Sequence, residues 1–453
     1  MFCQLRPYLA KRTPLSLRHA RSFSINPKYM GAVRGWGTIA NIAAGAYIGG
    51  LFVCLGSLYF VYYDAESRQH IPFELPFGEQ YTAVKAISKD DVLKSPRYAV
   101  KHYRRLLIDL ALQADPELQF SETLPDGSRN YAVPLLSSDT LVYHKTPEFA
   151  NFYIDMVLRY AKALLAKGQL DTSVAILKHI VDDDEIFYKL GDAERMSQCC
   201  RMLSKVSSVD DEKSKYLERG VNMLAQTFSS VKLQDNLLQE GSRITDELIL
   251  ALNALAFTYA RQSASAKGKT KQQLLSKSLN IYLANLKSLS EIKSAIDSGE
   301  RTQASFPLFN CDPENLQMTC AEIKAHISEI LWAKGYKKNA VAWGEEVVEE
   351  IYFDHNNVSR ASPILLNVLD NLATMYDQLH DKKSKQRCEG LKHDLQLFEG
   401  EQMSWYDSVV NRFTKIIYYK GPLGILEKAL KERFGQPERI PDIEEYEDED
   451  EEV

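Results

Sequence analysis

Residues 253–259 read Asn-Ala-Leu-Ala-Phe-Thr-Tyr and residues 370–376 read Asp-Asn-Leu-Ala-Thr-Met-Tyr, so the pattern Leu-Ala-x-x-Tyr occurs in both. Both copies lie in stretches whose apolar residues recur at helical spacing. The small residue after the leucine lets another helix come close, and the tyrosine fills the groove between the two helices. The residues predicted to pack in this way are Leu255, Ala256, Tyr259, Leu372, Ala373 and Tyr376.

Two further segments carry partial versions of this pattern, each followed by a glycine and a second amphipathic stretch. They contribute Tyr160, Ala161 and Gly168 in one case and Leu331, Gly335 and Ala340 in the other. A small residue, an aromatic residue, a turn glycine and a second-helix alanine at such offsets resemble degenerate tetratricopeptide repeats. We therefore predict an all-α protein with an α-solenoid of such repeats. An irregular helical bundle is the alternative, because similar spacings arise from packing alone.

Composition agrees with a helical domain. The 453 residues are 45% hydrophobic and 26% charged, which suffices for a filled core, and the 22 glycines and 16 prolines leave long uninterrupted stretches. The repeat domain is predicted over 95–434, beginning at Ser95-Pro96, which resembles a cap followed by a first-turn proline. The polar segments 262–270 and 298–313 are expected to be surface loops.

The N-terminal 63 residues contain seven basic side chains and no acidic one. An Arg- and Ser-rich leader without acids is typical of a mitochondrial presequence, predicted here over 1–23. Arg21, Phe23 and Ser24 form an arginine-led processing site, with the cut expected between Phe23 and Ser24. A flexible basic tail on a cytosolic protein is the alternative.

Residues 39–63 contain no charged side chain, and 25 residues in a helix can cross about 30 Å of hydrocarbon. We predict a single transmembrane helix there, in contact with the lipid bilayer. The basic flank predicts that 24–38 lies in the matrix and that the chain after the span lies in the intermembrane space. Gly45, Gly49 and Gly56 would let another transmembrane helix approach closely, or else simply face lipid.

The remaining segments are assigned by composition. Residues 64–94 contain Pro72 and Pro76 and no sustained helical period, so they are predicted to form a linker. Residues 435–453 are predicted to be an acidic disordered tail, and nine acids fall within 442–453. Residues 64–453 carry 48 basic and 61 acidic side chains, which disfavours binding to nucleic acid.

Catalytic and metal motifs are not found in the sequence. It contains no glycine-rich phosphate loop, His-Glu-x-x-His, Gly-x-Ser-x-Gly or paired-cysteine zinc spacing, and its nine histidines are scattered. We therefore expect no enzyme activity, no cofactor and no metal site, with an unfamiliar enzyme as the alternative. The seven cysteines are interpreted as free thiols, although Cys311 and Cys320 could form a bridge in an oxidising compartment.

A family resemblance is carried by the presequence, span, proline-containing linker, repeats and acidic end, together with the segment Ser95-Pro96-Arg97-Tyr98-Ala99-Val100-Lys101-His102-Tyr103-Arg104-Arg105-Leu106. The chain is similar to the fungal tetratricopeptide-repeat adaptor subunit of the mitochondrial i-AAA protease. The resemblance implies an inner-membrane protein that joins a second membrane-spanning adaptor and the AAA protease. It also implies delivery of unfolded or damaged membrane proteins for degradation. A respiratory-complex assembly factor and an outer-membrane import receptor share several of these features and remain alternatives.

A helical solenoid offers a surface made by the first helix of each pair, on which an extended polypeptide can lie. If the leucine, alanine and tyrosine of each pattern face the interior, helix geometry directs their neighbours toward that surface. The predicted client-binding residues are Asn253, Phe257, Arg261, Asp370, Thr374 and Gln378. Solvated polar residues, and a core position for Phe257, are the alternatives; the amphipathic segment 405–434 is then the next candidate.

Overall fold

The computed structural model describes residues 30–116, 120–121, 123, 129–190, 192–354 and 360–398. The predicted presequence with Arg21, Phe23 and Ser24, the segment 405–434 and the acidic tail 435–453 lie outside these residues. The chain divides into two compact units, and the larger one extends from Val61 to Tyr418.

Helix α1 (Met30–Arg68) is a single helix of 39 residues that contains the whole predicted span. By length and composition, the part from Thr38 to Arg68 is apolar enough to cross a membrane. Most of its large apolar side chains between Trp36 and Phe60 are exposed. Gly45, Gly49 and Gly56 lie on this helix with no other heavy atom near the position of a Cβ, so a partner helix on this side stays a prediction.

The expected linker over 64–94 is corrected by the structure, because most of it is helical. Helix α1 continues to Arg68, α2 covers Phe77–Ile87 and a π-helix follows over Ser88–Val92. Pro72 lies between the two helices and Pro76 is the N-cap of α2, where a missing amide hydrogen costs nothing. The prolines therefore mark the boundary between helices instead of excluding them.

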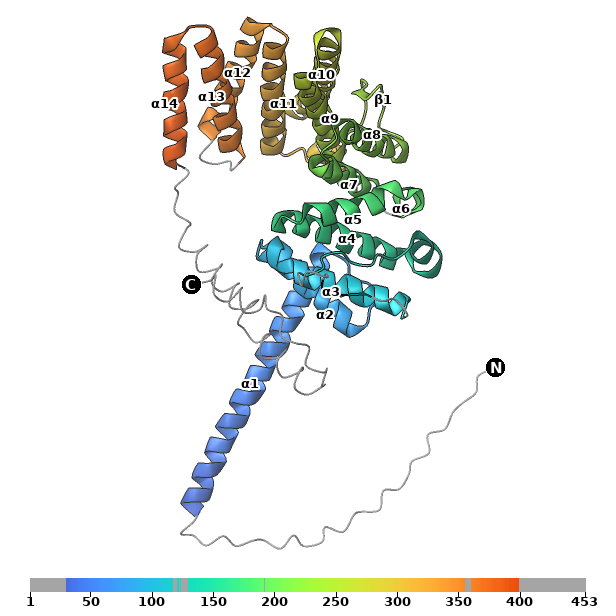
Figure 1. Ribbon diagram of the computed structural model, residues 1–453. Coiled ribbons are helices and arrows are strands. Elements are labelled where there is room, and N and C mark those ends of the chain that lie inside the picture. Colours follow the sequence, from blue (N-terminus) through green and yellow to red (C-terminus); the bar gives the residue numbers. More distant parts are fainter. Residues whose placement is uncertain are drawn as a thin grey trace, which may run out of the picture. The chain divides into compact units, whose positions relative to one another are not determined.

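The rest of the described chain forms helical hairpins that follow one another along the sequence (Figure 1). Helix α3 precedes five of them in the described residues: α4–α5, α7–α8, α9–α10, α11–α12 and α13–α14, with the short α6 inserted. The bounds are α3 Pro96–Ala114, α4 Pro147–Lys167, α5 Leu170–Asp182, α6 Asp184–Lys189, α7 Ala193–Val206, α8 Asp210–Thr227, α9 Asp246–Ser265, α10 Gly268–Asp297, α11 Pro313–Ala333, α12 Lys337–Ile351, α13 Ala361–Gln378 and α14 Lys382–Phe398.

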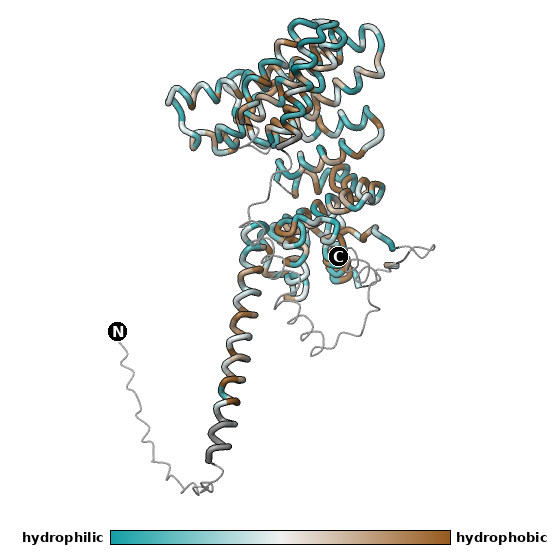
Figure 2. The backbone as a smooth tube through the Cα atoms, turned by 90° about the vertical axis from the view of Figure 1, so that its left-hand side faces the viewer, coloured by the Kyte–Doolittle hydropathy of each residue, from teal (hydrophilic) through white to brown (hydrophobic). Residues whose placement is uncertain are grey.

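Packing follows a repeating rule in which each hairpin contacts the next. The second helix of one hairpin packs on the first helix of the following one, as α8 does on α9, α10 on α11 and α12 on α13. Successive first helices also touch, in the pairs α7 and α9, α9 and α11, and α11 and α13. Apolar and polar residues alternate along the helices (Figure 2), and the buried core is made of the apolar ones. The described domain is thus an all-α stack of hairpins.

The connections differ from the expected ones at one point. Helix α9 runs to Ser265 and α10 starts at Gly268, so the predicted loop over 262–270 shrinks to two residues. Ser, Ala and Lys are compatible with a helix, and Gly268 supplies the positive φ that the turn needs. The segment 298–313 is non-helical apart from a 3₁₀ turn over Gln303–Ser305 and the first residue of α11.

The loop between α8 and α9 contains the strands found in the described residues. Strand β1 (Leu233–Gln234) pairs antiparallel with β2 (Leu237–Leu238). Asp235 and Asn236 between them both have positive φ, which matches a two-residue hairpin turn. This small ribbon leaves the helical stack uninterrupted.

Serine hydroxyls form hydrogen bonds between the two helices of three hairpins. Ser173 Oγ donates to the Ala161 carbonyl at 2.9 Å, and Ser278 Oγ donates to the Ala256 carbonyl at 2.6 Å. In α11–α12 the roles are exchanged, because Ser328 Oγ of the first helix donates to the Ala340 carbonyl of the second at 2.7 Å. All three alanines are fully buried. A small residue on each helix therefore permits the approach, and the hydroxyl adds a hydrogen bond across it.

Candidate binding surface

Side chains of successive first helices meet along one side of the hairpin stack, which we call the first-helix face. Four contacts define it: Arg195 with Asp155 at 2.5 Å, Arg201 with Glu247 at 2.7 Å, Phe257 with His326 at 5.9 Å between ring centroids, and Asn371 with Glu329 at 2.6 Å. They join α4 to α7, α7 to α9, α9 to α11 and α11 to α13. The first-helix face is therefore a continuous row of contacts between helices that are distant in sequence.

The half of this row nearer the N-terminus is ionic and largely shielded from solvent. Asp155 accepts a hydrogen bond from Gln69 Nε2 at 2.6 Å besides its pair with Arg195. Burial raises the pKa of the Asp155 carboxyl, and the charge of Arg195 opposes that rise. Arg201 Nε donates to Glu247 Oε1 at 3.0 Å, and Arg201 Nη2 donates to Glu247 Oε2 at 2.7 Å. Such desolvated, well-hydrogen-bonded pairs fix how α4, α7 and α9 sit against one another.

The middle of the row is apolar and open. Leu250 and Phe257 lie two turns apart on α9 and are 44% and 49% exposed. The ring of Phe257 lies against His326, which in turn stacks on Tyr282 of α10 at 5.3 Å. Helical spacing of seven residues places Leu250 and Phe257 on the same side of α9. This apolar pair is the part of the first-helix face best suited to hold another polypeptide.

Asn253 does not project toward this surface as predicted. Its backbone carbonyl accepts a hydrogen bond from Tyr282 Oη at 3.2 Å, and its Oδ1 accepts one from Asn285 Nδ2 at 2.9 Å. Both partners lie on α10, so Asn253 faces the inside of its own hairpin. The prediction failed because Tyr282 and Asn285 approach from a helix whose packing direction the local pattern does not encode. Phe257 and Arg261 are exposed.

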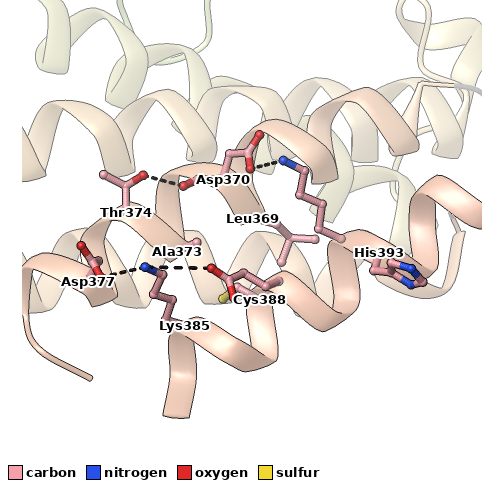
Figure 3. Close-up of a pocket in the computed structure, with 10 residues that line it drawn as sticks. Leu369, Asp370, Ala373, Thr374, Asp377, Lys385, Cys388 and His393 are labelled. Atoms are coloured by element: carbon pink, nitrogen blue, oxygen red, sulfur yellow. Dashed lines mark hydrogen bonds and ion pairs between the residues drawn. The ribbon is translucent and has the colours of Figure 1, made fainter. Parts of the chain in front are cut away.

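Asp370 and Thr374 lie in a groove between α13 and α14, drawn in Figure 3, with a volume of about 540 Å³. Asp370 pairs with Lys392 at 2.5 Å, and Thr374 Oγ1 donates to the Asp370 carbonyl at 2.9 Å. Asp377 pairs with Lys385 at 2.8 Å at the same groove. The two ion pairs connect α13 to α14, so the groove has charged walls. Gln378 is exposed and is not among the lining residues.

Ala373 also lines this groove and is only partly buried. It packs against the apolar cluster of α11–α14 but is less covered than the equivalent Ala256, which is fully buried against α10. The charged pairs of Asp370 and Asp377 bridge the two helices where small residues face each other in the earlier hairpins. Leu331 is partly buried beside the apolar cluster of α11–α14, and Leu372 is buried within it.

Tyr259 and Tyr376 have equivalent partners that the sequence pattern did not reveal. Tyr259 Oη donates to Glu218 Oε1 at 2.5 Å, and Tyr376 Oη donates to Glu345 Oε1 at 2.6 Å. Burial and the adjacent carboxylate raise the pKa of both phenols. Each glutamate lies on the second helix of the preceding hairpin, so these bonds tie neighbouring hairpins together. Tyr160 instead donates to the backbone carbonyl of Tyr131 at 2.7 Å.

Metal-binding side chains do not cluster in the described part of the chain. No cluster of three or more His, Cys, Asp or Glu side chains suited to a metal ion occurs there. Cys311 and Cys320 are free, buried thiols, so the bridge considered for them is not formed. Burial raises the pKa of the Cys311 thiol to about 11, which keeps it protonated and unreactive at neutral pH.

Comparisons with known proteins leave the family of this chain open. No protein-family model matches the sequence, and no curated protein matches it. Among solved structures, the chain is similar to a circular tandem repeat protein with novel repeat topology and enhanced subunit contact surfaces. That match has 12% identity, covers 78% of each chain and has a TM-score of 0.23, which is too low to bear on the fold.

Proposed function

We propose that this protein is a membrane-anchored adaptor whose tetratricopeptide-like repeats bind unfolded polypeptide segments on the first-helix face. The observation that carries the proposal is the exposed pair Leu250 and Phe257 in the middle of that face. These apolar side chains are exposed on an otherwise well-paired row of helices. A partner that covers them lowers the free energy of the complex, because apolar surface leaves water. The ion pairs on one side and the Asn371–Glu329 hydrogen bond on the other keep the helices in place while the partner changes.

The proposal extends to membrane and compartment. Helix α1 has the length and composition of a single span, and the basic, acid-free residues before it favour retention of the N-terminus in the matrix. The repeats would then work in the intermembrane space of mitochondria. By its resemblance to the adaptor of the i-AAA protease, we propose that the chain works with that protease and a second membrane-spanning adaptor on unfolded membrane proteins.

Client binding is tested with the full chain in detergent micelles and a labelled, permanently unfolded model protein. The variant with Leu250→Ser and Phe257→Ser should bind the client at least about tenfold more weakly, because it loses two apolar contacts. The matched control is Leu283→Ser, which changes an exposed leucine on the second helix α10. Equal client affinity in parent and double variant, with helicity preserved, would place the client site elsewhere.

The proposed partnership is tested by purifying the chain from mitochondria in mild detergent and identifying bound proteins by mass spectrometry. An AAA protease of the inner membrane should co-purify in near-stoichiometric amount. Recovery of respiratory-complex subunits in its place would favour an assembly factor. Digestion of the repeat domain by protease in intact mitochondria would contradict the proposed orientation.

A further inference from the structure

The segment between α1 and α2 presents two phenylalanines to the outside. Phe73 is 87% exposed and Phe77 is 69% exposed, whereas Ile71 and Leu75 are buried. Pro72 is buried as well. The buried members anchor the segment in the domain core, and the phenylalanines project from it.

This segment is held in place by hydrogen bonds on both sides. Ile71 N donates to Glu66 Oε2 at 3.0 Å, and Leu75 N donates to the Pro72 carbonyl at 3.2 Å. Gln80 Nε2 donates to the Leu75 carbonyl at 2.8 Å. Glu74 accepts a hydrogen bond from Thr146, far along the chain. The exposure of Phe73 and Phe77 is therefore built into a fixed turn.

The same turn lies close to the end of the apolar run. The run ends at Tyr63, and the protein already covers Val61 and Ala65, which are 3% and 1% exposed. Burial within the domain therefore begins, along the sequence, where the apolar run ends. Arg68, the last residue of α1, lies roughly 7.5 Å beyond Tyr63 along the helix axis. The five residues from there to Phe73 span at most about 18 Å, so the phenylalanines can return to the headgroup region of the bilayer.

We propose that Phe73 and Phe77 insert into the interfacial region of the bilayer that α1 enters, which gives the domain a second contact with the membrane. Aromatic side chains partition favourably at this depth, where their rings leave water without reaching the hydrocarbon centre. A single helix lets a domain rotate about the helix axis. A second contact beside it selects one side of the domain to face the lipid. This inference rests on the proposed membrane anchor.

The test replaces one phenylalanine at a time with the photo-crosslinking residue p-benzoylphenylalanine, which preserves the aromatic ring. The full chain is reconstituted into phosphatidylcholine vesicles, irradiated and analysed for lipid adducts by mass spectrometry. Phe52, exposed on the apolar run, is the positive control, and Phe353, which is 83% exposed on the 3₁₀ helix Tyr352–Asp354, is the negative control. Adducts are expected at positions 52, 73 and 77, at least about fivefold above position 353.

The two proposals fail in different ways in this experiment. Adducts at position 52 alone would overturn the interfacial contact and leave the anchor in place. A lack of adducts at position 52 would overturn the anchor itself. Equal adducts at 73, 77 and 353 would show that exposed phenylalanines react with lipid regardless of position, and this would also overturn the proposed contact.

Discussion

Glycines within helices mark the closest approaches in the hairpin stack. A Cβ on Gly344 would lie 2.8 Å from Leu372 Cδ2 and 3.3 Å from Ser328 Oγ. A Cβ on Gly220 would lie 3.2 Å from Cys200 Cβ and from the Ser197 backbone. Glycine weakens a helix by roughly 0.5–1 kcal/mol relative to alanine, so its presence at these crossings reflects packing. The second helices α8 and α12 can thereby lie close to α7 and to α13.

Gly344→Ala should lower the free energy of unfolding by about 1–3 kcal/mol, because its methyl group overpacks a buried leucine. The measurement is urea unfolding of the full chain in detergent. Gly390→Ala is the matched control, since Gly390 lies in α14 with no atom near the added methyl. The control should be neutral or stabilising by up to about 1 kcal/mol. Equal effects of the two changes would contradict the packing described for Gly344.

His102 makes the stability of the domain depend on pH. Its Nε2 is buried without a hydrogen-bond partner in the described residues. Burial first, and then the charges of Lys89, Lys85, Lys101 and Arg105, lower its pKa well below 6.5. When the pH falls below 6.5, the unfolded chain takes up a proton here and the folded chain does not, so stability is lost.

His102→Leu should therefore reduce the stability difference between pH 7.5 and pH 5.5. The free energies of unfolding are measured at both pH values for parent and variant. The four neighbouring cations do not titrate in this range, so the change reports on His102 itself. An unchanged pH difference in the variant would show that His102 is accessible to protons in the folded state.

At the scale of single helices, the charges in the first turn suit the helix dipole in some helices and oppose it in others. Helices α4, α5, α7, α8 and α9 carry acidic residues in their first turns, where a negative charge is stabilised by the positive end of the helix dipole. Helices α10, α12 and α14 carry no acid there and have lysines in their first turns, such as Lys337-Lys338 and Lys382-Lys383. These second helices owe their stability to packing against their neighbours.

Lys338→Glu should raise the free energy of unfolding by about 0.3–1 kcal/mol, because it replaces an unfavourable charge at the N-terminus of α12. Lys205 gives the opposite control, since it is an exposed lysine in the last turn of α7, where a cation is favourable. Lys205→Glu should lower stability by a similar amount. Both effects should shrink in 1 M salt. Effects of the same sign would exclude the dipole as their cause.

At the scale of the whole molecule, the apolar helix and the repeat domain share residues. Val61, Ala65, Ile71 and Leu75 are all part of the domain core, and Gln69 bonds to Asp155 of α4. The domain is therefore attached to α1 by packed and hydrogen-bonded residues.

Ile71→Ala should lower the free energy of unfolding of the domain by about 2–5 kcal/mol, because it leaves a cavity beneath the α1–α2 turn. Phe73→Ala, two residues away, should change it little, since that side chain is exposed. Denaturant unfolding in detergent, where no bilayer contributes, compares the two variants. Similar costs for both changes would contradict the burial of Ile71 and the exposure of Phe73.

Several features follow from the sequence because they depend on neighbours along the chain. The apolar run 39–63 lies within one helix, Ser95-Pro96 starts α3, and Gly168 and Gly335 adopt the positive φ of a helix end. Helical period, proline and glycine act within one or two turns, so they can be recognised without knowledge of the fold. The linker prediction failed because α2 is held by packing against α3 more than by its own pattern.

Only the tertiary structure decided which helix covers each face. The copies of Leu-Ala-x-x-Tyr are alike in sequence, yet Ala256 is fully buried against α10 and Ala373 lines an open groove. Asn253 faces inward because Tyr282 and Asn285 donate hydrogen bonds to it. The first-helix face is held together by pairs of distant residues such as Arg201 and Glu247. The physical reason is that helical periodicity determines which residues share a face, whereas the partner of that face depends on contacts between distant parts of the chain.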